Sequence, residues 1–229
     1  MNDSGDATTG QDIILAKALQ ELADAVFPGV HTALRRILPE DGNALTQAEQ
    51  AAIARAVPSV KSASGAARIA ARRLMMQLGV TPGSLVKRQG RGPIWPAELS
   101  GSLSHDPELA AAAVGRRTAW RSIGIDIEPA EALPAEMLKL VATASERTQL
   151  NGDLVQARLL FCIKEAVFKA THPLDNVFLE HHDVEVDLRA SIARTTSGCV
   201  VAFATLQRGR LIALAAIAQA PRAVSPVPA

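Results

Sequence analysis

Several residue types that commonly build special sites are scarce in this chain. Its 229 residues include two cysteines and no tyrosine, and aromatic residues make up 3% of the sequence. Cys162 and Cys199 lie within apolar sequence and form no C-x-x-C pattern, so we expect both to be reduced residues of the core. A zinc site built on cysteine is therefore excluded, and a metal site would have to use oxygen ligands.

The chain also lacks an excess of charge of either sign. Lysine and arginine number 24 against 23 aspartate and glutamate residues, which gives a formal net charge of +1. This balance does not indicate nucleic acid or a membrane as the partner, and any basic site has to be local. No apolar run reaches membrane-spanning length, and the start of the chain, with Asp3 and Asp6, does not resemble a secretory signal. We expect a cytoplasmic protein without a membrane span, and a monomer.

The sequence does contain enough apolar residues for a sizeable core. Hydrophobic residues account for 48% of it, which suits one large domain or two small ones. Helices are predicted over residues 12–25, 46–57 and 64–78. Asp12 is the expected cap of the first helix, and Thr46 with Glu49 forms a capping box for the second. Residues 81–101 are rich in proline, glycine and cations and predict a loop suited to phosphate, with a plain surface connection as the alternative.

The second part of the chain contains both strands and helices. The predicted elements are a hairpin over residues 99–114, a strand over 122–128, short helices over 134–140 and from 146, a long helix over 153–170, and strands over 184–188, 200–205 and 211–218. His105 would lie at the hairpin turn, close enough to strand 122–128 for both to share one cleft. Residues 1–11 and 219–229 are polar or proline-rich, and we expect them to be disordered.

The predicted strand over residues 122–128 alternates apolar and acidic residues. Asp126 and Glu128 therefore face the same way, about 7 Å apart along the backbone, while the isoleucines between them face the opposite side. Two such carboxylates can converge on one hard cation such as Mg²⁺. An exposed strand face near a turn is the alternative interpretation of this short pattern.

The predicted long helix carries a second charged pair. Glu165 and Lys169 are four residues apart and lie on one face, in the order that favours an ion pair. A surface pair contributing about 0.3 kcal/mol is the structural alternative. Lys164 points about 100° away from Glu165, so Lys164 and Lys169 need not have the same role.

Four segments together resemble one family. They are Arg91-Gly92-Pro93-Ile94-Trp95-Pro96, Gly101-Ser102-Leu103-Ser104-His105, Gly124-Ile125-Asp126-Ile127-Glu128 and Phe161-Cys162-Ile163-Lys164-Glu165-Ala166-Val167-Phe168-Lys169. Over residues 61–171 the chain resembles the Sfp-type 4'-phosphopantetheinyl transferases, and it looks closest to the enterobactin-synthetase component D branch. The resemblance implies an α+β fold of two similar halves related by pseudo-twofold symmetry, with the active site in the cleft between them. The corresponding halves would be residues 12–121 and 122–218.

The resemblance also implies an activity. Members of this family transfer the 4'-phosphopantetheine arm of coenzyme A to a serine of an apo acyl or peptidyl carrier protein and release adenosine 3',5'-bisphosphate. The implied cofactor is Mg²⁺, with Mn²⁺ able to substitute. The sequence leaves open whether the carrier protein belongs to siderophore, polyketide or fatty-acid synthesis.

The matching positions suggest roles for individual residues. The implied metal ligands are Asp126, Glu128 and Glu165, and the implied coenzyme A contacts are Arg68, Arg88, Arg91, Ser104, His105, Lys164 and Lys169. Arg88 and Arg91 compete for one role at the 3'-phosphate. Lys169 would lie beside the pyrophosphate. For the base that activates the carrier serine, Glu165 is the first choice, Glu146 the second and a metal-bound water the third. The last two stay open because a ligand carboxylate such as Glu165 would have a depressed pKa and be a weak base.

Two other functions and one docking surface remain as expectations. The alternatives are another Mg²⁺-dependent phosphoryl or nucleotidyl enzyme, although no Walker loop is present, and an inactive carrier-protein-binding module. An acidic carrier would need a local basic patch, since the net charge is near zero. The candidates for that patch are Arg116, Arg117 and Arg121, together with Trp120, Met137, Leu138 and Leu140.

Overall fold

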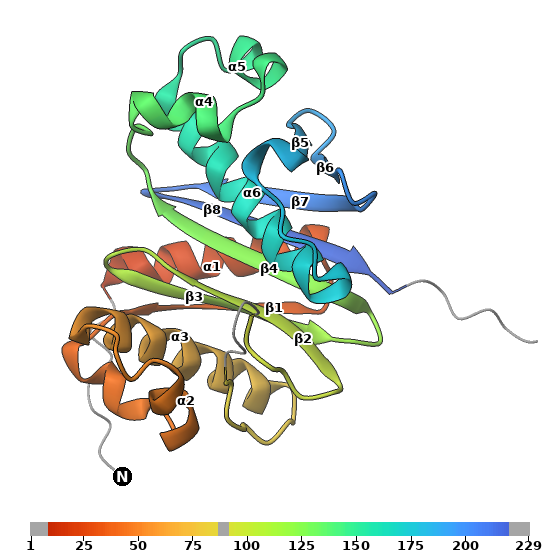
Figure 1. Cartoon of the computed structure of the whole chain (residues 1–229). Coiled ribbons are helices and arrows are strands. Elements are labelled where there is room, and N and C mark those ends of the chain that lie inside the picture. The colour runs from red at the N-terminus through yellow and green to blue at the C-terminus, as the bar shows by residue number, and fades with distance from the viewer. Residues whose placement is uncertain (1–8, 87–91, 220–229) are drawn as a thin grey trace, which may run out of the picture.

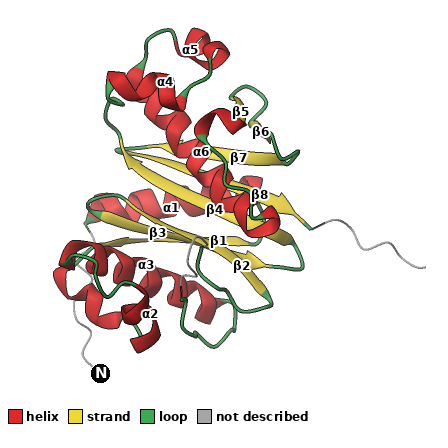
Figure 2. Cartoon of the chain, in the orientation of Figure 1, coloured by secondary structure: helices red, strands yellow, loops and turns green. Residues whose placement is uncertain are grey.

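The computed structural model describes residues 9–86 and 92–219. It has an α+β fold with two antiparallel sheets, as predicted (Figures 1 and 2). Arg88 and Arg91, and most of the two predicted disordered tails, lie outside the described residues. In the described part, no helix has the length and apolar character needed to cross a membrane.

The first sheet has three strands, and the long helix α3 covers one face of it. The strand order is β1-β3-β2, with bounds β1 Val30–Arg36, β2 Leu99–His105 and β3 Leu109–Arg116. The helices of this region are α1 Gly10–Val26, α2 Gln47–Ala52 and α3 Pro58–Gln77, with a 3-10 turn over Pro39–Ala44. Alanines of α3 and of β3 pack together. Their small side chains allow the helix to lie close to the sheet.

The second sheet has five strands, and the long helix α6 crosses it. The strand order is β4-β8-β7-β6-β5, with bounds β4 Trp120–Pro129, β5 Val184–Asp187, β6 Ile192–Thr195, β7 Val200–Gln207 and β8 Arg210–Ala218. The helices are α4 Leu138–Val141, α5 Ala144–Leu150 and α6 Leu154–Asp175, with 3-10 turns over Ala135–Met137 and His181–Asp183. Gly124 of β4 permits the contact with α6, because a Cβ there would lie 1.9 Å from the carbonyl oxygen of Ala166.

The two sheets share a core. Ile123, Ile125 and Ile127 of β4 are fully buried in it, on the face away from α6. Residues of α1 and of both sheets fill the same core, and Figure 1 shows α1 running between the sheets. The predicted alternation of strand β4 is therefore confirmed. Strands β2 and β4 pack against each other, and the division into halves at residues 121 and 122 stays a prediction.

Several details of the predicted elements were wrong. The cap of α1 is Thr9, and Asp12 is its partner in a capping box. Helix α2 ends at Ala52, and α3 begins at Pro58, because proline is well suited to the first turn of a helix. Strand β1 was not predicted, since only Val30 of its residues is buried and no alternation marks it. The second sheet has the additional four-residue strand β6.

Candidate active site

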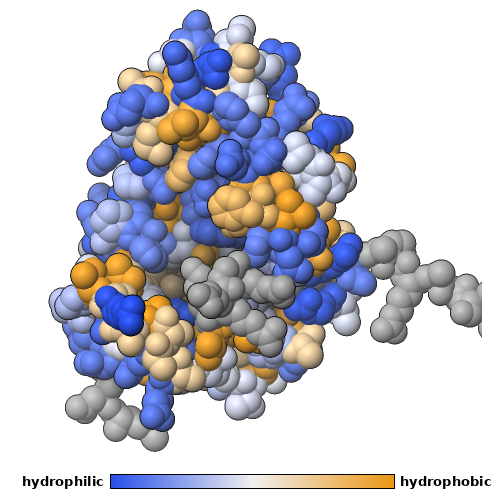
Figure 3. Space-filling model, viewed as in Figure 1, coloured by the Kyte–Doolittle hydropathy of each residue, from blue (hydrophilic) through white to orange (hydrophobic). Residues whose placement is uncertain are grey.

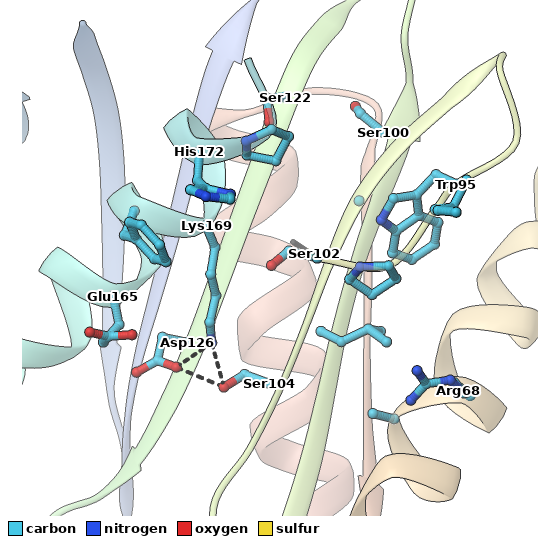
Figure 4. A pocket seen from close by; sticks show the side chains of 18 of the residues that line it. Arg68, Trp95, Ser100, Ser102, Ser104, Ser122, Asp126, Glu165, Lys169 and His172 are labelled. Atoms are coloured by element: carbon cyan, nitrogen blue, oxygen red, sulfur yellow. Dashed lines mark hydrogen bonds and ion pairs between the residues drawn. The ribbon is translucent and has the colours of Figure 1, made fainter. Parts of the chain in front are cut away.

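A pocket with a volume of about 940 Å³ lies between α3 and β2 on one side and β4 and α6 on the other. Its walls come from α3, the segment before β2, β2 itself, β4 and α6. Figure 4 shows Asp126 of β4, Ser104 of β2 and Lys169 of α6 meeting at one end of it. Figure 3 shows a hydrophobic patch over the C-terminal part of α6, which is followed by the exposed residues Val177 and Phe178. The structure therefore has a cleft lined by strands of both sheets.

Asp126 is the centre of a hydrogen-bond network at this end of the pocket. Its Oδ1 accepts a hydrogen bond from Ser104 Oγ (2.7 Å) and one from Lys169 Nζ (2.7 Å), and Lys169 Nζ also donates to Ser104 Oγ (3.0 Å). The residue is only 4% exposed. Its second oxygen, Oδ2, is buried and has no hydrogen-bond partner among the described residues. A buried carboxylate oxygen without a partner is costly and fits a cation that the protein binds.

Glu128 lies two residues further along the same face of β4. Its Oε2 accepts a hydrogen bond from Arg158 Nη1 of α6 (2.9 Å). Burial raises the pKa of Glu128, the Asp126 carboxylate raises it further, and Arg158 opposes both effects. Glu128 is not among the residues that line the pocket, so a cation at Asp126 would have to compete with Arg158 for this carboxylate.

Glu165 lines the pocket from α6 and is partly exposed. Its Oε1 lies 3.2 Å from His181 Nε2, a nitrogen that is buried and has no hydrogen-bond partner in the described part of the chain. The predicted ligands Asp126, Glu128 and Glu165 all belong to β4 and α6. Across residues 9–86 and 92–219, however, no three histidine, cysteine, aspartate or glutamate side chains lie close enough together to hold a metal ion. The donor types fit Mg²⁺, but the three carboxylates are not gathered around one point.

Cationic and polar groups line the wall of the pocket that α3 and β2 form, opposite α6. Arg68 of α3 is buried, and burial lowers its pKa. Its Nε and Nη2 donate to the carbonyl oxygen of Leu85, and its Nη1 donates to Ser64. His105 is exposed at the end of β2 and also lines the pocket. Arg68 therefore reaches the pocket with most of its donors already engaged.

Comparisons with known sequences identify the family. A family model described as the 4'-phosphopantetheinyl transferase N-terminal domain matches residues 48–115, and the 4'-phosphopantetheinyl transferase superfamily model matches residues 122–215. The transferase Npt of Nocardia iowensis is 35% identical over 181 residues, which cover 77% of this chain and 81% of that protein. The chain belongs to the 4'-phosphopantetheinyl transferase superfamily.

Two further relatives match shorter segments. The 4'-phosphopantetheinyl transferase Svp of Streptomyces mobaraensis is 38% identical over 155 residues, which cover 65% of this chain and 63% of Svp. Enterobactin synthase component D of Salmonella typhimurium is 36% identical over 113 residues, which cover 46% of this chain and 45% of that protein. The matched segments thus span less than two thirds of both relatives. The resemblance to the enterobactin branch is confirmed over this shorter segment.

Two residues that the family resemblance placed in the site lie elsewhere. Lys164 is 1% exposed and Glu146 is 3% exposed, and neither lines the pocket. Lys164 Nζ donates to Glu146 Oε2 (2.7 Å) and to the carbonyl oxygens of Val141 and His181. Glu146 also accepts hydrogen bonds from the backbone N–H groups of Thr143 and Val186. Because every one of these partners is internal, the structure argues against Lys164 as a coenzyme A contact and against Glu146 as the base.

The predicted docking patch is only partly assembled. Arg117 and Arg121 are exposed and border the pocket. Trp120 faces away from it, because its ring contacts Phe27 (5.5 Å between centroids) and its Nε1 donates to the carbonyl oxygen of Pro28. Met137 and Leu138 pack on the core under α6, so of the predicted apolar residues Leu140 alone is strongly exposed.

Helix α6 contributes further pocket residues that were not predicted from the sequence. His172 and Phe168 line the pocket from α6, and Arg158 on the same helix pairs with Glu128. Positions 165, 168, 169 and 172 recur at helical spacing, so the stripe that contains Glu165 and Lys169 already pointed to His172. The prediction ended the helix near Ala170, two residues too early to include it.

Proposed function

We propose that this protein transfers the 4'-phosphopantetheine arm of coenzyme A to a serine hydroxyl of an apo acyl or peptidyl carrier protein, releasing adenosine 3',5'-bisphosphate. The observation that carries the proposal is the network of Asp126, Ser104 and Lys169, with its unpartnered Oδ2, inside a pocket of about 940 Å³. That volume suits a ligand of nucleotide size. Membership of the superfamily supports the same reaction.

The reaction exchanges one bond at phosphorus. The serine oxygen attacks the phosphorus that carries the arm, the bond from this phosphorus to the bridging oxygen breaks, and the bisphosphate leaves with the electron pair. Negative charge develops on the leaving group, so a fixed cation beside the pyrophosphate stabilises the transition state. Lys169 can supply this charge, because Asp126 and Ser104 hold its ammonium group at the pocket wall.

A divalent cation is part of the proposal. Asp126, Glu128 and Glu165 would hold Mg²⁺, or Mn²⁺ in its place, and the unpartnered Asp126 Oδ2 is the atom that supports this assignment. When bound, the ion would neutralise charge on the pyrophosphate. Glu128 makes a smaller contribution in this proposal, because Arg158 already neutralises part of its charge.

Glu165 is the proposed base that accepts the serine proton. It lines the pocket and is partly exposed, so a serine side chain can reach it, whereas Glu146 is enclosed by internal hydrogen bonds. The neighbouring His181 nitrogen, 3.2 Å from Oε1, would steady the carboxylate. In the described part of the chain, no other carboxylate that lines the pocket is free of an ion pair to lysine or arginine.

Location and assembly are further parts of the proposal. We propose that the protein acts as a monomer in the cytoplasm, where coenzyme A and apo carrier proteins are present together. Sedimentation at several protein concentrations tests the monomer, and a mass that rises with concentration would contradict it.

The deciding experiment is a transfer assay read by intact mass. The protein is incubated with coenzyme A, Mg²⁺ and a panel of apo acyl and peptidyl carrier proteins, and we expect at least one carrier to gain the mass of one phosphopantetheine group. A carrier whose acceptor serine is replaced by alanine should gain nothing. Release of pyrophosphate would instead indicate a nucleotidyl enzyme, and binding of a carrier without any mass gain would indicate an inactive module.

A further inference from the structure

His172 is a buried polar side chain that the proposed mechanism does not use. It lies on α6, is 9% exposed and lines the pocket. Its ring contacts Phe168, with 5.0 Å between the ring centroids. In the described part of the chain neither ring nitrogen forms a hydrogen bond with another residue, and neither is among the buried side-chain atoms that lack a partner, so the nitrogens are accessible from the pocket. The imidazole therefore has hydrogen-bonding capacity to offer to a ligand in the pocket.

The side chain lies away from the carboxylates. On α6 it follows Lys169 by three residues and Glu165 by seven, which at 1.5 Å per residue places it about 4.5 Å and about 10 Å further along the helix axis. Strand β2 runs beside β4 along the pocket. Ser104 donates a hydrogen bond to Asp126 at one end, and Ser100 donates one to the carbonyl oxygen of Trp120 at the other. Figure 4 accordingly shows His172 near Ser122, at the end of the pocket opposite Asp126.

The chemistry of this end differs from that of the carboxylate end. Figure 4 shows Trp95, Ser100 and Ser122 toward this end, and the ring of Phe168 contacts His172. Pro173 and Leu174, which follow His172 in the chain, also line the pocket. Its charged members, Arg117 and Arg121, are exposed and therefore border solvent. An apolar channel with a few neutral polar groups suits a ligand of the same character.

We infer that His172 is a specificity-determining residue that hydrogen-bonds a neutral amide or hydroxyl group of the phosphopantetheine arm. The inference rests on the proposed function. It follows from the order of groups in coenzyme A, where the pyrophosphate separates a charged nucleotide from a mostly apolar arm that carries amides and a hydroxyl. With the pyrophosphate beside Lys169 and the bisphosphate end toward Arg68 and His105 on the opposite wall, the arm extends along α6 toward His172.

Calorimetric titration with two ligands tests the inference. Coenzyme A carries the arm, and adenosine 3',5'-bisphosphate lacks it. The variant His172→Phe keeps a ring against Phe168 but removes both nitrogens, so it should bind coenzyme A about three- to tenfold more weakly than wild type does, while its affinity for the bisphosphate stays the same. His172→Gln keeps a hydrogen-bonding group and should recover part of the lost affinity.

A matched control and the remaining outcomes complete the test. His182 is an exposed histidine outside the pocket lining, so His182→Phe should leave both affinities unchanged. Equal losses for both ligands in His172→Phe would overturn the inference, as would unchanged affinity for coenzyme A. Failure of wild type to bind coenzyme A would overturn the proposed function as well, which separates that outcome from the other two.

Discussion

Two lysine–carboxylate pairs involve the same helix, α6, and have the same separation of 2.7 Å, yet their surroundings differ. Lys164 and Glu146 are both almost completely buried, whereas Lys169 is 27% exposed and faces the pocket with Asp126. Both carboxylate oxygens of Glu146 and the Lys164 ammonium group have partners inside the protein. Asp126, by contrast, keeps one buried oxygen without a partner among the described residues.

The comparison separates a structural pair from a functional one. The Lys164 pair ties α6 to the start of α5 and to strand β5, and burial lowers the pKa of Lys164. Because all polar atoms of this pair have hydrogen-bond partners inside the protein, the pair has no free donor or acceptor for a ligand. The unpartnered oxygen of Asp126 has a cost in the folded state, and binding a ligand cation would offset it. The two pairs carry the same charges, so the unpartnered oxygen of Asp126 is what distinguishes the functional pair from the structural one.

The largest expected effect concerns the structural pair. Lys164→Met leaves Glu146 buried without its counter-charge, so we expect it to lower the free energy of unfolding by about 3–5 kcal/mol. Denaturation by urea, followed by circular dichroism, measures the change. A loss below about 1 kcal/mol would show that the pair does not hold α5 and α6 together.

Metal binding gives the next largest effect and concerns the pocket pair. At a concentration one hundred times its Kd, Mg²⁺ should raise the free energy of unfolding of wild type by about 2.7 kcal/mol. Asp126→Asn should lose most of this gain, because an amide oxygen is a weaker ligand for a hard cation than a carboxylate oxygen. Thermal unfolding with and without Mg²⁺ provides the measurement, and Glu131→Gln, at an exposed site, is the control. Equal stabilisation of wild type and Asp126→Asn would remove Asp126 from the metal site.

A double variant sharpens the assignment of the structural pair. Adding Glu146→Gln to Lys164→Met removes the unpaired charge and keeps one oxygen, which can accept from the N–H group of either Val186 or Thr143. The double variant should therefore be more stable than Lys164→Met alone by at least about 1 kcal/mol. Additive losses in urea denaturation would mean that the two side chains act independently.

The smallest effect is a pH dependence at Glu128. Because burial raises its folded pKa above the usual 4.5, its contribution to stability is fully present below that value and is lost as pH rises through the folded pKa. At neutral pH and without metal, Glu128→Gln should thus be slightly more stable than wild type, and the difference should shrink as the pH falls toward 4.5. Urea denaturation across this range tests the sign. A variant that is less stable than wild type at neutral pH would show that the ion pair with Arg158 outweighs burial.

Much of the fold could be predicted from local patterns. The alternation of β4, the capping box at Thr46 and the periodicity of α6 each depend on neighbours in sequence, and the structure confirms all three. Strands β1 and β6 could not be predicted in the same way. Strand β1 has one buried residue and β6 has four residues in all, so pairing with distant strands determines them.

The part of the site that depends on local spacing was also predictable. The shared face of Glu165 and Lys169 follows from helical spacing, and both residues line the pocket. The partner of Lys164 could not be read from spacing, because Glu146 lies 18 residues away on another helix. Similarly, Glu128 meets Arg158 across 30 residues. Which charges are satisfied inside the protein depends on such distant contacts, and those contacts decide between a structural and a functional role.

The most direct test compares the transfer rates of Asp126→Asn and Glu146→Gln, measured together by intact mass and expressed per folded molecule at a temperature where both variants are folded. We predict that Asp126→Asn loses at least about a hundredfold in rate, as expected for the loss of electrostatic stabilisation of a transition state. Glu146→Gln should transfer within about threefold of wild type, a difference below about 0.7 kcal/mol. Similar losses in the two variants, or a larger loss in Glu146→Gln, would contradict the assignment of function to the pocket pair.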